Sequence, residues 1–91
     1  MTPADLLGRY AARRDAEAFA EIVRLHQRMV FATCRRNLHD PSDLDDAVQE
    51  TFLRLAQKAG ELKSNLAGWL YRCAANVATD INRRRASRQK H

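Results

Sequence analysis

The chain has 91 residues, of which 45% are hydrophobic and 30% charged, and its formal net charge is +5. This length allows one compact domain with a single core, and the scarcity of glycine and proline predicts an all-α fold. No stretch approaches the roughly 18 apolar residues that a membrane span requires, and no signal peptide is recognisable, so we expect a cytoplasmic protein without membrane contact.

Two helices are expected in the first part of the chain. Thr2 and Pro3 are typical of a helix N-terminus, and this first helix should end near Arg14. Asp15 can cap a second helix that runs to about Asn37. Apolar residues recur in the second helix every three to four positions, and we assign the following to its core-facing side: Phe19, Ile22, Val23, Leu25, Met29, Val30, Phe31 and Leu38.

A third helix is expected after residues 40–43 (Asp-Pro-Ser-Asp), where Asp40 or Ser42 serves as the N-cap. This helix should reach Ala59, and Gly60 should end it as a C-cap. Residues at the spacing of one helix face form its predicted core stripe: Leu44, Ala47, Val48, Thr51, Phe52, Leu55 and Ala59.

A fourth helix should begin at Leu66, after a polar connector at residues 61–65 in which Ser64 or Asn65 can act as the N-cap. Its predicted core stripe consists of Leu66, Leu70, Cys73, Ala74, Val77 and Ile81. From Arg83 onward the sequence is basic and poor in apolar residues, so we expect this end to fray or to lead into a linker.

Charged residues are distributed unevenly along the chain. Residues 40–50 contain five acidic and no basic side chains, whereas residues 72–91 contain six basic side chains and one acidic. Such a separation of charge suggests two different partners. We expect a compact bundle of about four helices in residues 1–86, followed in residues 87–91 by the start of a basic linker, with no second domain in this chain.

The third helix carries a second stripe on the side opposite its core. The members of this stripe are spaced i, i+3, i+4 and i+7: Asp46, Gln49, Glu50 and Leu53. A solvated acidic face is one interpretation, since most charged helix faces bind no partner. A helix-in-groove contact with a basic partner helix is favoured because Leu53 points away from the core among polar side chains.

The outward side of the fourth helix combines small and amide side chains with cations. Its predicted members are Arg72, Ala75, Asn76, Thr79, Asn82 and Arg83. Small residues allow a close approach, asparagine can pair with a base edge, and arginine neutralises phosphate, so a nucleic acid is the natural partner. A plain solvated helix face is the alternative.

Residues 45–55 (Asp-Asp-Ala-Val-Gln-Glu-Thr-Phe-Leu-Arg-Leu) resemble the second conserved region of bacterial sigma factors. The similarity extends to both neighbouring helices, at Ala18-Phe19 through Arg36 and at Gly68-Trp69-Leu70-Tyr71-Arg72, Ala75-Asn76 and Asp80. Together these segments cover residues 15–86 and are similar to the extracytoplasmic-function (ECF) group of the sigma-70 family.

This resemblance implies a region 2 domain that acts in transcription initiation and is not an enzyme. It implies docking on the clamp helices of the RNA polymerase β′ subunit, capture of the promoter's minus-ten element, and an anti-sigma factor as a further partner. By position, Asp46, Gln49 and Glu50 match the residues that contact the clamp helices, and Leu53 would be their apolar anchor. A complete factor of this group normally has a second domain for the minus-thirty-five element, so we expect this chain to be a fragment or excised domain.

The resemblance also assigns residues to the DNA. Asn76 falls where these factors read the non-template strand, and the connector from Gly60 to Asn65 falls where they hold a flipped-out base. Together with the polar and basic side chains of the fourth helix, these positions give the predicted DNA-binding set: Lys63, Ser64, Asn65, Arg72, Asn76, Thr79, Arg83 and Arg84. This connector is shorter than in many members and lacks their aromatic residue, and Trp69 is interpreted as a packing residue.

Two other classes of function are alternatives for this sequence. A sigma mimic that sequesters a regulator without binding DNA is disfavoured by the basic end of the fourth helix. A thiol or metal enzyme is disfavoured because His26, Cys34, His39 and Cys73 show neither catalytic nor metal-ligand spacing, so we expect no catalytic residue, metal or cofactor. We expect His26 to pack in the core with a hydrogen bond. Asp80 is expected to be a buried carboxylate with a partner among Arg35, Arg36, Arg84 and Asn76.

Overall fold

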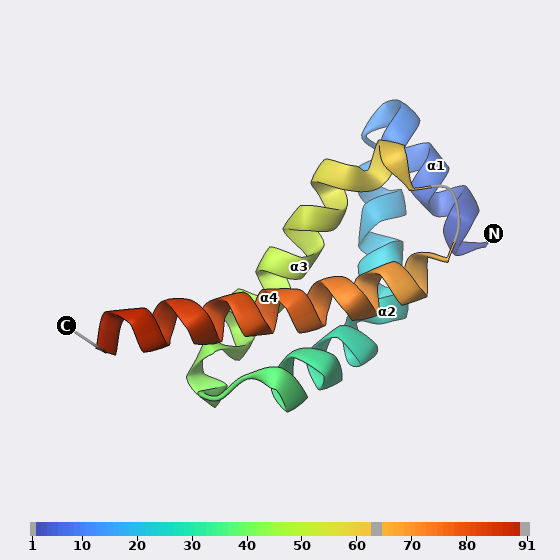
Figure 1. Ribbon diagram of the computed structural model, residues 1–91. Coiled ribbons are helices and arrows are strands. Elements are labelled where there is room, and N and C mark those ends of the chain that lie inside the picture. Colours follow the sequence, from blue (N-terminus) through green and yellow to red (C-terminus); the bar gives the residue numbers. More distant parts are fainter. Residues whose placement is uncertain (1, 63–64, 90–91) are drawn as a thin grey trace.

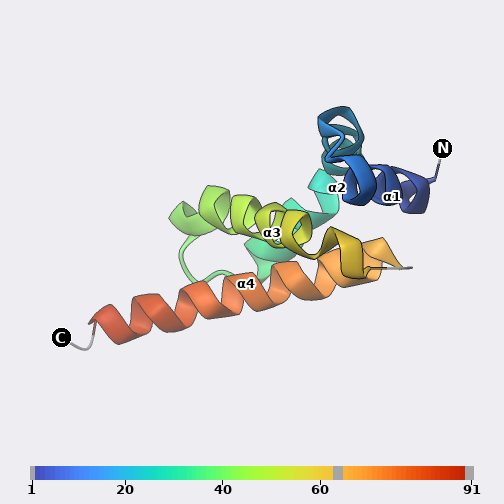
Figure 2. The same cartoon turned by 90° about the horizontal axis from the view of Figure 1, so that it is seen from above.

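The computed structural model describes residues 2–62 and 65–89 and confirms the all-α class. Its helices, in chain order, are α1 (Pro3–Arg13), α2 (Ala16–Asn37), α3 (Leu44–Lys58) and α4 (Leu66–Gln89), with short 3-10 turns η1 (Pro41–Asp43) before α3 and η2 (Ala59–Glu61) after it. α1 packs against α2 and η2, and α4 lies across both α2 and α3 (Figures 1 and 2). None of the described helices is long and apolar enough to cross a membrane.

Side-chain caps fix the beginnings of the first helices as predicted. Thr2 and Asp5 form a capping box, in which each side chain accepts a hydrogen bond from the other residue's backbone N–H. Asp15 accepts from the first turn of α2. Asp40 accepts from the N–H of Ser42 at 2.9 Å and so caps η1, whereas the N-cap of α3 is Asp43, which makes no side-chain capping hydrogen bond. These backbone N–H donors hold the pKa of the three accepting carboxyls below the ordinary value of aspartate.

The end of α3 differs from the prediction at Gly60. The helix tightens after Lys58 into the 3-10 turn η2, and none of the three glycines has a positive φ. Gly60 is therefore not a left-handed C-cap, because the tighter turn satisfies the last carbonyls of the helix by closer hydrogen bonds. Asn65 has the positive φ instead, at 53°, and it caps α4 by accepting a hydrogen bond from the N–H of Gly68 at 3.1 Å.

The core forms where the helix stripes of α2, α3 and α4 meet. Its fully buried side chains include Ile22, Val30, Leu55, Leu70 and Val77. His26 is 9% exposed, and its Nδ1 lies 2.8 Å from the carbonyl oxygen of Ile22, as the sequence predicted. The assignment of Leu25 and Phe31 to the core is wrong, since they are 45% and 40% exposed. They lie on either side of the Ile22–Val30 stripe, beyond the width of α2 that α3 and α4 cover.

The basic end of the chain is helical, contrary to the expectation that it frays. α4 continues to Gln89, and its last turns extend past the other helices (Figure 1). Asn82 anchors this part of α4 to the end of α2, because its Oδ1 accepts from the N–H of His39 at 2.9 Å and its Nδ2 donates to the carbonyl of Asn37 at 2.7 Å.

A second anchor lies one turn further along α4, at Arg85. Its Nε and Nη2 each donate to a carboxylate oxygen of Asp43 at 2.9 Å, and its Nη1 lies 3.2 Å from Asp40. Hydrogen bonding to Arg85 holds the pKa of Asp43 below its ordinary value, and the same bond raises the pKa of Arg85. The connector between α2 and α3 thus stabilises a segment that its composition alone suggested would be loose.

Candidate functional site

The predicted stripe on α3 forms an exposed ridge. We call Asp46, Gln49, Glu50 and Leu53 the α3 ridge; three of them are exposed, Glu50 is half-buried, and Leu53 is 55% exposed. The ridge arises because α3 buries its opposite stripe against α2 and α4, which leaves these positions directed outward. The structure therefore brings all four predicted residues together on one side of one helix.

An apolar groove follows one flank of the α3 ridge, between α2 and α3. Leu53 and Gln49 line it from α3, and Phe31 lines it from α2. The other lining residues are Phe19, Val23, Gln27, Val48, Phe52 and Ala56. An apolar depression beside an exposed leucine is a surface on which an amphipathic helix can bury its apolar side. The contribution of α2 was not predicted, because the apolar spacing of α2 assigns Phe31 to the core-facing side.

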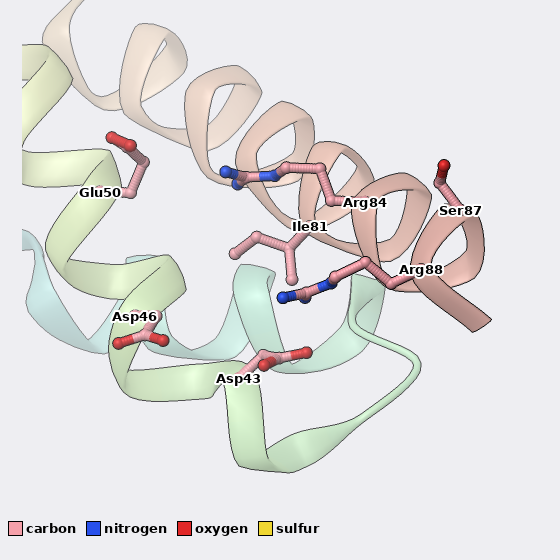
Figure 3. Close-up of a pocket in the computed structure, with 7 residues that line it drawn as sticks. All are labelled: Asp43, Asp46, Glu50, Ile81, Arg84, Ser87 and Arg88. Carbon is pink, nitrogen blue, oxygen red and sulfur yellow. The ribbon is translucent and has the colours of Figure 1, made fainter. Parts of the chain in front are cut away.

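A charged groove follows the other flank of the α3 ridge, between α3 and the end of α4. Asp43 at the end of η1 and Asp46 and Glu50 of α3 line one side of it, while Arg84 and Arg88 reach into it from α4 (Figure 3). We call this the α3–α4 groove; its volume is about 570 Å³. The α3 ridge therefore separates an apolar surface from a surface that carries charges of both signs.

Four residues predicted to contact DNA lie in one exposed line along α4. Arg72, Asn76, Thr79 and Arg83 are spaced four, three and four positions apart, so they share one side of the helix. The side chains of Arg72 and Asn76 form no hydrogen bond with another described residue, and the Thr79 hydroxyl donates to the backbone of its own helix at 2.9 Å. We call this line the α4 face, and it offers a free amide between cations.

The end of α3 adds polar residues beside the α4 face that were not predicted as site residues. A shallow groove of about 400 Å³ is lined by Arg54, Gln57, Lys58, Trp69, Arg72, Cys73 and Asn76. Arg54 and Lys58 are spaced i, i+4, so they lie on one side of α3. This spacing is visible in the sequence, but the two residues do not belong to the stripe of Asp46, Gln49, Glu50 and Leu53. Trp69 packs partly against the core, as predicted.

Two residues lie away from the α4 face: Arg84, which was predicted to bind DNA, and Asn82, which was predicted on the outward side of the helix. Arg84 faces the α3–α4 groove, not the line from Arg72 to Arg83 (Figure 3). Asn82 is half-buried, and both ends of its side-chain amide are hydrogen-bonded to the backbone around the end of α2. The structure thus separates these two side chains from the α4 face.

The expected partners of Asp80 are wrong. Its side chain is 40% exposed, and it pairs with Arg54 at 3.3 Å and with Arg83 at 3.5 Å. Asp80 lies at the edge of the core stripe of α4 on the side of α3, so the nearest cation belongs to α3 and not to α2.

Within the predicted base-holding connector, Asn65 lies in the described part of the chain, whereas Lys63 and Ser64 lie outside it. The side-chain oxygen Oδ1 of Asn65 is already used to cap α4, and a Cβ at Gly68 would come within 2.6 Å of the side-chain Nδ2 of Asn65. Asn65 and Leu62 also border a depression of about 300 Å³ that reaches the start of α1. Asn65 therefore has a structural role in starting α4, whatever it contacts in a complex.

Both cysteines are free and buried. Burial raises the pKa of the Cys34 and Cys73 thiols, so both are protonated at neutral pH and poor nucleophiles. In the part of the chain that the structure describes, no three His, Cys, Asp or Glu side chains gather as a metal site would require.

Sequence comparison relates the chain to sigma factors. The model of the Sigma-70 region 2 family matches residues 22–89. The ECF RNA polymerase sigma factor SigW of Bacillus subtilis is 32% identical over 73 residues, which cover 78% of this chain and 39% of that protein. The RNA polymerase sigma factor NccH of Alcaligenes xylosoxydans xylosoxydans is 33% identical over 86 residues, or 92% of this chain and 46% of NccH. No solved structure matches the chain.

This chain spans less than half the length of each of these two relatives. Both are named as sigma factors, which agrees with the prediction that the chain is not an enzyme. The family match begins in α2 and includes the α3 ridge, the connector at residues 61–65 and the α4 face. The chain therefore belongs to the sigma-70 region 2 family, as region 2 of an ECF sigma factor.

Proposed function

We propose that this chain docks a sigma factor on core RNA polymerase and binds the minus-ten element of a promoter, so that transcription can start. In this proposal the α3 ridge contacts the clamp helices of the β′ subunit, and the α4 face contacts the non-template strand, in the cytoplasm. An anti-sigma factor is a further proposed partner. The observation that carries the proposal is an exposed Leu53 beside an apolar groove, within a ridge that is otherwise polar and acidic.

Docking on the α3 ridge would combine apolar burial with charge recognition. Full burial of a leucine side chain contributes about 1.5 to 3 kcal/mol, and Leu53 has more than half of its surface available for this. The Asp46 and Glu50 carboxylates would attract a basic helix and fix its orientation. Because all four ridge residues come from one helix, a partner helix can contact them together.

Binding of an open DNA strand is supported by the α4 face. The free Asn76 amide can form two hydrogen bonds with a base edge, while Arg72 and Arg83 at the two ends of the line can neutralise phosphates. An open strand presents base edges that are hidden in a duplex. Tighter binding of the open strand than of the duplex would shift the population toward melted DNA without a chemical step.

The docking proposal is tested by pull-down of a β′ clamp-helix fragment. The double variant Gln49→Ala with Glu50→Lys should abolish capture, because it removes one ridge contact and reverses the charge of another. Gln57→Ala with Glu61→Lys is the matched control, since it makes the same chemical changes at exposed positions outside the ridge. Unchanged capture by the ridge variant would overturn the docking proposal.

The DNA proposal is tested with fluorescent minus-ten single strands. Asn76→Ala should lose the preference among minus-ten sequences, whereas Arg83→Ala should weaken all strands alike and reduce the salt slope by roughly one. Equal losses for every sequence in both variants would contradict base reading by Asn76. No binding of any strand, with docking retained, would instead favour the sigma mimic that sequesters a regulator.

A further inference from the structure

The last turns of α4 place two arginines opposite the acidic residues of the α3 ridge. Arg84 and Arg88 follow Ile81 at intervals of three and four, so they continue the core stripe of α4 beyond its last buried residue. No core remains there to receive an apolar side chain. The two guanidinium groups enter the α3–α4 groove instead and point toward α3 (Figure 3).

Asp46 and Glu50 form no ion pair with the two arginines on the opposite wall of this groove. Within the described residues, no hydrogen bond or ion pair engages the side chains of Asp46, Glu50, Arg84 or Arg88, although the charge of Arg88 helps to lower the pKa of Asp43, and the adjacent Arg85 is fully engaged. About 570 Å³ of open space separates the two walls. The groove therefore presents unpaired charges of both signs to whatever lies against it.

This arrangement selects one kind of partner on electrostatic grounds. Phosphates of DNA would be attracted by the arginines but repelled by the carboxylates of the opposite wall. A helix carrying only basic side chains would be attracted by Asp46 and Glu50 but repelled by Arg84 and Arg88. A helix with basic and acidic side chains on one side satisfies both walls, and it can contact Ile81 at the base of the groove.

We propose that Arg84 and Arg88 belong to the polymerase-docking surface, where they bind an acidic side chain of the same helix whose basic side chains contact Asp46 and Glu50. This inference rests on the docking role proposed for the α3 ridge and adds a requirement on the partner. A helix that lacks the acid would leave two arginines facing cations, so the arginines act as specificity residues.

The experiment measures the affinity of the whole chain for a purified β′ clamp-helix fragment by titration calorimetry. The test variant is Arg84→Gln with Arg88→Gln, and the control is Arg35→Gln with Arg36→Gln, which removes the same charge from two exposed arginines on α2. We expect the test variant to bind about tenfold more weakly or worse, and the control to stay within about twofold of wild type. Equal thermal midpoints for all three proteins would exclude a folding defect.

Each other result has a defined meaning. Unchanged affinity of the test variant would overturn the inference while leaving the docking proposal intact. Tighter binding would also overturn it, because the arginines would then mask the acids. Similar losses in test and control would show a general charge effect and overturn it as well. Failure of the wild-type chain to bind the fragment would overturn the docking proposal itself. If the test variant lost more affinity for minus-ten single strands than the control, both arginines would be DNA-binding residues, and the inference would be overturned.

Discussion

Replacement of Asn82 by alanine should destabilise the domain without removing a DNA contact. Asn82 joins α4 to the end of α2 through two hydrogen bonds, with the N–H of His39 at 2.9 Å and with the carbonyl of Asn37 at 2.7 Å. The Asn37 carbonyl is one of the last in its helix and has no partner within it. Each bond between neutral groups contributes about 0.5 to 1.5 kcal/mol net. Since water can replace both partners, we expect a loss of about 1 to 2 kcal/mol.

Asn76→Ala is the matched control, because it makes the same change on the same helix at an exposed residue without a hydrogen bond to another described residue. Both variants share the gain in helix propensity, which is below about 0.7 kcal/mol, so their difference isolates the Asn82 hydrogen bonds. Urea denaturation gives this difference directly, and each kcal/mol should lower the thermal midpoint by about 4 to 8 °C. Equal stability of the two variants would refute the reasoning. In the DNA assay the order reverses: Asn82→Ala should retain minus-ten preference and Asn76→Ala should lose it.

Two further predictions concern titration and thiol reactivity. Because Arg85 lowers the folded-state pKa of Asp43, the stability that Asp43 contributes is present above about pH 4 and is lost as the pH falls through the folded-state pKa. Urea denaturation at several pH values between neutral and acidic should therefore show that the free energy of unfolding falls less steeply with pH for Asp43→Asn than for Asp45→Asn. The same slope for both variants would contradict the pairing of Asp43 with Arg85. Cys34 and Cys73 should react slowly with a thiol reagent in the folded protein and rapidly in denaturant, because both are buried; rapid reaction without denaturant would contradict their burial.

Features set by neighbours in the chain were predictable from the sequence. The cap at Asp15 and the core stripe of α3 from Ala47 to Leu55 depend on residues three or four positions apart, and both are confirmed. The α3 ridge follows for the same reason, since the side opposite a buried stripe must face outward. Periodicity alone therefore located the candidate docking surface, although it could not show which flank is apolar.

Features that depend on packing between helices were not predictable. Phe31 has the right residue type for a core, and only the positions of α3 and α4 decide that it borders a groove instead. Asp80 and Arg54 are 26 positions apart, and no local pattern pairs them. The anchor of Asn82 on the end of α2 spans 45 positions to Asn37. Such contacts depend on how α4 crosses α2. The apolar stripes imply that the two helices pack together, but they do not determine the angle at which the helices cross.

The three consecutive arginines of α4 show how one correction could have been made without a structure. Successive residues of an α-helix point roughly 100° apart, so three neighbours cannot share one surface. Arg83 continues the line of Asn76 and Thr79, Arg84 continues the core stripe toward α3, and Arg85 reaches the α2–α3 connector. The local basic composition is therefore divided among the α4 face, for which DNA binding is proposed, the α3–α4 groove, for which polymerase docking is proposed, and a structural ion pair. Because the net charge of a helical run does not identify its partner, each arginine has to be assigned by the side of the helix that it occupies.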